Sequence, residues 1–179
     1  MAHCIIENGT ISHNGTIIFS EQDLSFADFS KKAYKALQIN YPKFFKMDNL
    51  SKLAFLASEV ILGNLPQEEK KDIALVFANK SASLDTDIKH QESIDDSENY
   101  YPSPAVFVYT LPNICLGEIS IRHQLQTENA FFIFEKHPKV FFENYTKILI
   151  NNKLAKKVLC GWVDFLTPDY KAELNLVGN

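Results

Sequence analysis

The chain has 179 residues, of which 46% are hydrophobic and 12% aromatic, with only 6 Gly and 7 Pro. This composition is typical of one globular domain with a substantial core, and it excludes a disordered or fibrous chain. The net charge is −4 and the pI is near 5.7, so no global basic field favours nucleic acid or an anionic membrane. We predict a single domain over residues 1–179.

The three cysteines, Cys4, Cys115 and Cys160, form no CxxC pair, and with five scattered His they offer no metal-ligand spacing. We therefore predict reduced thiols, a cytoplasmic location and no metal. No apolar run approaches the ~18 residues of a membrane span, and the N-terminus lacks a signal-peptide pattern. The absence of a Gly-rich phosphate loop or nucleotide fingerprint predicts no cofactor.

The first third of the chain predicts a strand pair and two helices. Strands are expected at residues 4–7 and 16–19, around the Asn-Gly pairs at Asn8 and Asn14. Residues 25–37 predict a helix capped by Ser25. Residues 47–62 predict the clearest helix, with Asp48 as N-cap and an apolar stripe that indicates core.

The middle of the chain predicts a buried strand and a polar segment. Residues 72–79 are an apolar run typical of a strand covered on both faces. Residues 81–102 are rich in Asp and Glu, and we predict an acidic surface loop with one short helix. The carboxylate spacing fits no EF-hand, so a solvated face is preferred to a cation site.

Later residues predict alternating helices and strands. Thr110 is expected to cap a helix reaching residue 126, with Leu111, Ile114, Cys115 and Ile119 buried. Gly117 in mid-helix is unfavourable relative to Ala unless another backbone packs close to it. A short buried strand at residues 130–134 is expected next. Pro138 then opens a helix, and strands follow at 157–165 and 171–177. The helix after Pro138 is predicted to bury one face, made of Phe141, Tyr145, Ile148 and Leu149. This order favours an α/β fold with a mixed, mostly parallel sheet layered with helices.

Several segments resemble the N-terminal half of a β-ketoacyl-acyl-carrier-protein synthase, of the thiolase-like superfamily. The matching residues are Met47-Asp48 with LSKLA after them, the strand IALVFAN, Ser103-Pro104 with Phe107, Leu111-Pro112-Asn113, the GEISI run from Gly117 with Leu125, and Ile11-Ser12 near the start. They resemble the family's "R-M-D-x-x-S-R-L-A" and "L-P-N-x-x-x-G-x-I-x-I" patterns in order and spacing. The likeness covers most of this chain but about half of a full synthase. It implies a thiolase-like half-domain.

The resemblance also implies that the family's chemistry is missing. In the family, the strand matching residues 130–134 leads into "T-A-C-x-x-G", whose Cys at a helix N-terminus takes the acyl chain. Alignment back from Cys160-Gly161-Trp162 places Lys136 at that position, with Glu135 and His137 adjacent. Lysine forms no acyl thioester. The family's "H-G-T-G-T" half is absent from this sequence.

Other residues offer weaker candidates for catalysis. Cys115 on a buried helix face and Cys160 in a strand interior are interpreted as inert packing. Arg122 and His123 are expected to cap helix carbonyls or face solvent. We therefore predict no catalytic residue in this chain. Glu135 and His137 remain the best functional candidates, although a plain surface turn is the preferred interpretation.

We hypothesise a truncated, non-catalytic 3-oxoacyl-ACP synthase-like protein. The resemblance implies a homodimer, or a heterodimer with a ketosynthase-like chain, in the manner of chain-length-factor subunits in fatty acid, polyketide or aryl-polyene-type synthesis. One alternative is an acyltransferase completed by a second chain. Another is a module that binds an acyl chain or an acyl carrier protein. A basic set is the candidate carrier-docking or partner surface: Lys136, Lys139, Lys147, Lys153, Lys156 and Lys157.

Overall fold

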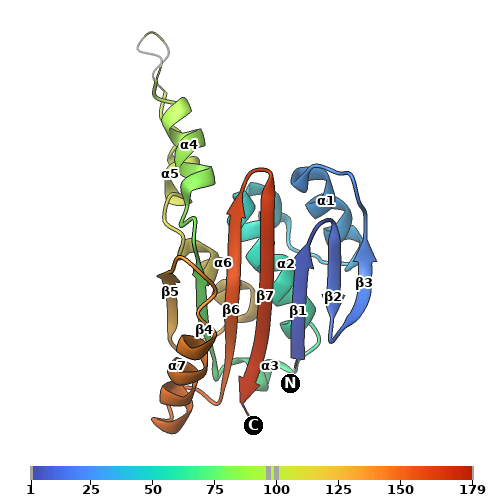
Figure 1. The fold of residues 1–179 in the computed structure, drawn as a ribbon, viewed down its shortest axis with the longest axis vertical. Helices are drawn as coiled ribbons and strands as arrows, with labels where there is room; N and C mark the ends of the chain where they lie inside the picture. The colour runs from blue at the N-terminus through green and yellow to red at the C-terminus, as the bar shows by residue number, and fades with distance from the viewer. Residues whose placement is uncertain (1, 96–97, 99–100, 179) are drawn as a thin grey trace.

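The computed structural model describes residues 2–95, 98 and 101–178 (Figure 1). One seven-stranded sheet carries helices on both faces. The elements in chain order are β1 (Ala2–Glu7), β2 (Thr10–His13), β3 (Thr16–Ser20), α1 (Phe26–Ala36), the 3-10 helix η1 (Pro42–Lys46), α2 (Asn49–Leu62), α3 (Gln67–Lys70), β4 (Ile73–Asn79), α4 (Leu84–Glu92), α5 (Pro104–Val108), α6 (Ile114–His123), β5 (Asn129–Ile133), α7 (Lys139–Asn151), β6 (Lys157–Leu166) and β7 (Asp169–Gly178).

The sheet has the order β3-β2-β1-β7-β6-β4-β5. The predicted α/β class with a mixed sheet is confirmed, but the expectation of a mostly parallel sheet is wrong. Only the β4–β5 and β4–β6 pairs are parallel, and the other four are antiparallel. Short connections account for three of the four, because tight turns join β1 to β2, β2 to β3 and β6 to β7, and a tight turn produces an antiparallel pair.

The N-terminal region contains three strands where two were predicted. Asn8 and Gly9 both have positive φ, and so do Asn14 and Gly15, so each Asn-Gly pair closes its own hairpin. The four residues between the two turns therefore form β2, with Ile11 fully buried. The sequence signal for the turns was correct, and the missed strand lies between them.

One face of the sheet is covered by α1, α2 and α6, which bury the larger core. The predicted helices at 25–37 and 47–62 are confirmed as α1 and α2. The Ser25 hydroxyl accepts a hydrogen bond from the Asp28 amide at 3.2 Å, and the Asp48 carboxylate accepts one from the Ser51 amide at 2.9 Å. Both N-caps satisfy amides that have no partner inside the helix, so they fix where each helix begins.

The helix expected over 110–126 is present only in part, as α6 over Ile114–His123, and a separate short helix that was not predicted, α5, precedes it over Pro104–Val108. The Thr110 hydroxyl donates back to the Phe107 carbonyl at 2.7 Å, so Thr110 closes α5 instead of starting a helix. Cys115 and Ile119 are buried as predicted, whereas Leu111 lies exposed in the turn between the helices. A Cβ added at Gly117 would meet no atom of the described residues within 4 Å, so no close backbone accounts for this glycine.

The acidic segment 81–102 includes α4, which extends with α5 away from the sheet (Figure 1). Asp96 of this segment lies outside the described residues. Asp85 is not solvated: its carboxylate accepts hydrogen bonds from Thr167 and from Asn49, the latter at 3.2 Å, and it pairs with Lys89. These bonds tie α4 to α2 and to the β6–β7 turn.

The other face of the sheet carries α7, which packs over β4 and β6. The strand expected at 130–134 is present as β5, but it is half exposed because it is an edge strand and not a buried one. Pro138 does precede α7. The buried residues of α7 are Phe142, Thr146 and Leu149, so the prediction is confirmed for Leu149 and wrong for Ile148, which is exposed. Phe141 and Tyr145 pack sideways against Phe132.

Candidate functional site

The turn between β5 and α7 holds the position that the resemblance assigned to the family nucleophile. Glu135 and Lys136 are exposed, whereas the His137 ring turns inward. Its centroid lies 5.8 Å from the Trp162 ring and 5.5 Å from the Phe142 ring. Neither ring nitrogen has a hydrogen-bond partner in the described structure. Burial lowers the pKa of His137, although the charge of Glu173 opposes that shift.

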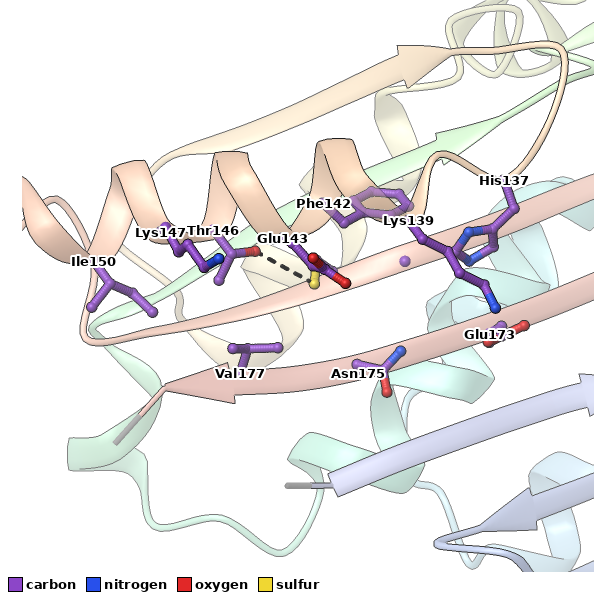
Figure 2. Close-up of a pocket in the computed structure, with 12 residues that line it drawn as sticks. His137, Lys139, Phe142, Glu143, Thr146, Lys147, Ile150, Glu173, Asn175 and Val177 are labelled. Carbon is purple, nitrogen blue, oxygen red and sulfur yellow. Dashed lines mark hydrogen bonds between the residues drawn. The ribbon is translucent and has the colours of Figure 1, made fainter.

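A cavity of about 430 Å³ lies between α7 and the strands β6 and β7, with His137 at one end (Figure 2). Its walls are mainly apolar. It is lined by His137, Lys139, Phe142, Glu143, Thr146, Lys147, Ile150, Cys160, Gly161, Glu173, Asn175 and Val177. The α7 residues recur every three or four positions, so the cavity follows one side of the helix.

Cys160 contributes its thiol to the floor of this cavity. The Thr146 hydroxyl lies 3.7 Å from the Cys160 sulfur and donates a hydrogen bond to it. Burial raises the pKa of Cys160 despite that bond, and burial also raises the pKa of Cys115 well above its ordinary value. A protonated thiol is a poor nucleophile, so the geometry gives neither cysteine the environment of a reactive thiolate.

The six lysines of the predicted basic set fall into two groups. Lys156 pairs with Asp72, and Lys157 pairs with Glu69 at 2.7 Å. The remaining four make no ion pair within the described residues and lie on α7 or next to its ends: Lys136, Lys139, Lys147 and Lys153. Lys139 and Lys147 both line the cavity. The structure therefore leaves four of the six available to a partner.

Arg122 and His123 were expected to cap carbonyls or face solvent, and this is wrong. Arg122 Nε lies 2.7 Å from the Glu59 carboxylate and His123 Nε2 lies 3.1 Å from it. Burial alone would raise the pKa of Glu59, but hydrogen bonds from His123 and Arg122 outweigh burial and hold that pKa below its ordinary value. This network joins α2 to α6. Sequence reasoning missed it because Glu59 lies beside an apolar stripe 63 positions before Arg122.

The sheet face beside α7 is polar where no helix covers it. Lys171 lies 3.0 Å from the Glu7 carboxylate and 3.7 Å from that of Glu173. On β7, Lys171, Glu173 and Asn175 alternate with residues that are buried against the opposite face, namely Ala172, Leu174 and Leu176. The part of this face formed by β1 and β7 is therefore polar enough to be exposed to solvent.

The side chains able to ligate a metal are scattered over the fold. Among residues 2–95, 98 and 101–178, no group of three or more His, Cys, Asp and Glu could hold a metal ion. No helix in the same residues is long and apolar enough to cross a membrane.

The chain shares its fold with solved ketosynthase and chain length factor structures. The chain is similar to a chain of the ishigamide ketosynthase/chain length factor, with a TM-score of 0.69 and 16% identity over 99% of this chain and 61% of that one. It is also similar to a chain of the complex between a ketosynthase (ApeO) and its chain length factor (ApeC) from Xenorhabdus doucetiae. That match has a TM-score of 0.64 and 14% identity, and it covers all of this chain and 78% of the other.

A third similar structure is a type II PKS acyl-carrier protein in complex with its ketosynthase, AntDE:AntF. The TM-score is 0.60 and the identity 15%, over 98% of this chain and 62% of that one. The chain thus spans about three-fifths of the length of two of these neighbours. No family model matches it, and no curated protein matches its sequence. Identities this low establish the shared fold and nothing finer.

Proposed function

We propose that this protein is a non-catalytic, chain-length-factor-like partner that pairs through β5 with a ketosynthase-like chain or with a second copy of itself. The open edge of β5 is the observation that carries the proposal. β5 pairs on one side with β4 and lies at the end of the sheet, so within the part of the chain that the structure describes no strand lies beside its outer backbone groups. An unpaired edge is a template for strand addition.

Apolar side chains near this edge support the proposal. Ile133 of β5 is 50% exposed, and Val140 at the start of α7 is also exposed. On the inner side, Phe132 packs against Phe141 and Tyr145, which holds the strand rigid against α7. A rigid edge flanked by exposed apolar groups suits an interface between two folded chains.

The lack of a reactive thiol at the nucleophile position supports a non-catalytic role. Glu135, Lys136 and His137 occupy the turn, and the pKa of the nearby Cys160 is raised by burial. Incubation with acyl- and malonyl-loaded carrier protein should therefore leave the intact mass unchanged. A thioester adduct mapped to Cys115 or Cys160 would contradict the non-catalytic assignment.

The polar sheet face disfavours the alternative in which a second chain supplies a missing catalytic half against it. Such a half would bury Lys171 together with Glu7 and Glu173, and burial is unfavourable because one ammonium does not balance two carboxylates. The edge-pairing proposal leaves these side chains in water. It therefore fits the observed polarity better.

The partner role is tested by two matched substitutions at opposite edges of the sheet. Ile133→Lys on β5 should weaken the complex with a ketosynthase-like chain of the same organism, or the homodimer, by about tenfold or more. Ile17→Lys on β3, where Ile17 is 63% exposed, should leave association unchanged. Size-exclusion chromatography with light scattering measures both. Equal effects of the two variants, or no association at any concentration, would refute pairing through β5.

We also propose that the unpaired lysines on α7 and next to its ends bind an acyl carrier protein. The observation that favours this is the absence of an ion-pair partner for Lys136, Lys139, Lys147 and Lys153 within the described residues. Carrier proteins are acidic, so reversal of these charges to Glu should abolish carrier binding at low salt. Reversal of Lys31, Lys32 and Lys35 on α1 is the control. If the two sets weaken binding equally, docking is nonspecific and the proposal fails.

A further inference from the structure

The cavity beneath α7 changes in character from one end to the other (Figure 2). Lys139, Glu173 and His137 lie at one end, and Ile150 and Val177 lie at the other, with Lys147 beside Thr146 on the way to Ile150. Cys160 and Gly161 form the floor, where the Thr146 hydroxyl is already bonded to the thiol. A cavity with apolar walls and a few polar groups at one end suits a ligand with an apolar body and a polar head.

The charged residues that line the cavity indicate whether the polar head of the ligand is an anion or a cation. Lys139 at the polar end, and Lys147 nearer the other end, have no ion-pair partner within the described residues, whereas Glu173 is paired with Lys171. Glu143 is the one lining carboxylate left unpaired in that part of the chain, so unpaired cations outnumber unpaired anions. An anionic head is therefore favoured over a cationic one.

Two features at the polar end strengthen the preference for an anion. Helix α7 begins there without a side-chain cap at Pro138 and without an acidic residue in its first turn, so the positive end of its dipole is uncompensated. The Asn175 carboxamide makes no hydrogen bond within the described structure and can donate one. A carboxylate is an anion that accepts from both an ammonium and an amide.

We propose that this cavity binds a small amphipathic carboxylate, with its carboxylate facing Lys139 and Asn175 and its apolar body over Cys160, toward Ile150 and Val177. The volume of about 430 Å³ lies within the range of small-molecule sites. From Lys139 to Ile150 the helix rises roughly 16 Å, which leaves room for an extended chain of moderate length. The site involves neither the β5 edge nor a carrier protein, so this proposal can be tested independently of the proposed function.

Trp162 provides a direct readout of binding. It is the only tryptophan in the chain, and its ring stacks on His137, which lines the cavity. Titration with octanoate should give a saturable change in Trp162 fluorescence. Octan-1-ol, which lacks the charge, should bind about tenfold more weakly, and octylamine more weakly still.

Matched variants test where the carboxylate binds. Lys139→Glu, at the polar end of the cavity, should weaken octanoate binding by about tenfold or more. Lys136→Glu, three residues earlier and exposed outside the cavity, should change it by less than about twofold. Equal effects of both variants, or no saturable response to octanoate, would overturn the proposal.

A second measurement does not depend on any substitution. Saturating octanoate should slow the reaction of N-ethylmaleimide with Cys160, because the apolar body covers the thiol. Cys4 and Cys115, which are buried elsewhere, serve as internal controls whose labelling should not change. Peptide mass mapping distinguishes the three thiols. Unaltered labelling of Cys160 at saturating octanoate would also overturn the proposal.

Discussion

The two faces of the sheet differ in how completely they are covered. On one face, α1, α2 and α6 cover β1, β7, β6 and β4, and the buried side chains form the larger core. On the other, α7 covers β4 and β6 with a smaller core, while β1 and β7 present Glu7, Lys171 and Glu173 to water. The first face is built for stability. The second carries the cavity and the unpaired lysines, so two of the three proposals concern the side of the molecule where burial is incomplete, and the third concerns the β5 edge of the sheet.

The largest expected effect is the loss of stability when a buried leucine is truncated to alanine, and this loss should differ between the two faces. Leu53→Ala, in the core beneath α2, should lower the free energy of unfolding by about 4 kcal/mol. Leu149→Ala, beneath α7, should lower it by about 2 kcal/mol, because a region beside a cavity relaxes more easily around a lost side chain. Urea unfolding measures both. Equal losses would mean that the two faces are equally well packed.

Glu59→Gln tests the ion-pair network of the well-packed face. The substitution leaves Arg122 and His123 without their carboxylate, and the free energy of unfolding at neutral pH should fall by about 2 kcal/mol. The pKa of Glu59 is lowered in the folded state, so its contribution is complete above its ordinary pKa. The contribution is lost as pH falls through the lower folded-state pKa. The difference between wild type and variant should therefore shrink in acid. A difference that persists or grows there would contradict this assignment.

Gly117→Ala should stabilise the protein by about 0.5–1 kcal/mol. A Cβ at Gly117 meets no atom within 4 Å, and glycine within a helix is unfavourable relative to alanine. Thermal unfolding should give a raised midpoint. Gly161→Ala on β6 is the contrasting variant, because its Cβ would lie 2.0 Å from the Glu173 carbonyl oxygen and φ there is +154°. It should destabilise strongly, and a rise in its midpoint would show that the close β6–β7 approach is wrong.

The smallest effect is expected on the open sheet face. Lys171→Met removes ion pairs to Glu7 and Glu173, but these groups are partly exposed and screened. The free energy of unfolding should change by no more than about 0.5 kcal/mol, and less in high salt. Chemical denaturation at two salt concentrations checks this. A large loss would mean that the face is not open to water and that another part of the molecule covers it.

Some predictions succeeded from sequence because the signal is local. Asp48 and Ser25 cap helices through bonds to amides three residues away, and the apolar stripe of α2 needs no distant partner. The turns at Asn8 and Asn14 depend on residues that tolerate positive φ. The short helix α5 was missed and the start of α6 was predicted too early, because Thr110 can bond in either direction along the chain and here bonds back to Phe107.

The sequence alone determined the alternation of helices and strands, the buried β4 and β6, and the absence of a cysteine at residues 135–137, since all of these are properties of neighbouring residues. Only the tertiary structure decided that β5 is an edge, that Glu59 meets Arg122 and His123, and that Cys160 and Asn175 share a cavity with α7. Those facts depend on which strand lies beside which. Strand order is set by packing between segments far apart in the chain, which no local pattern encodes.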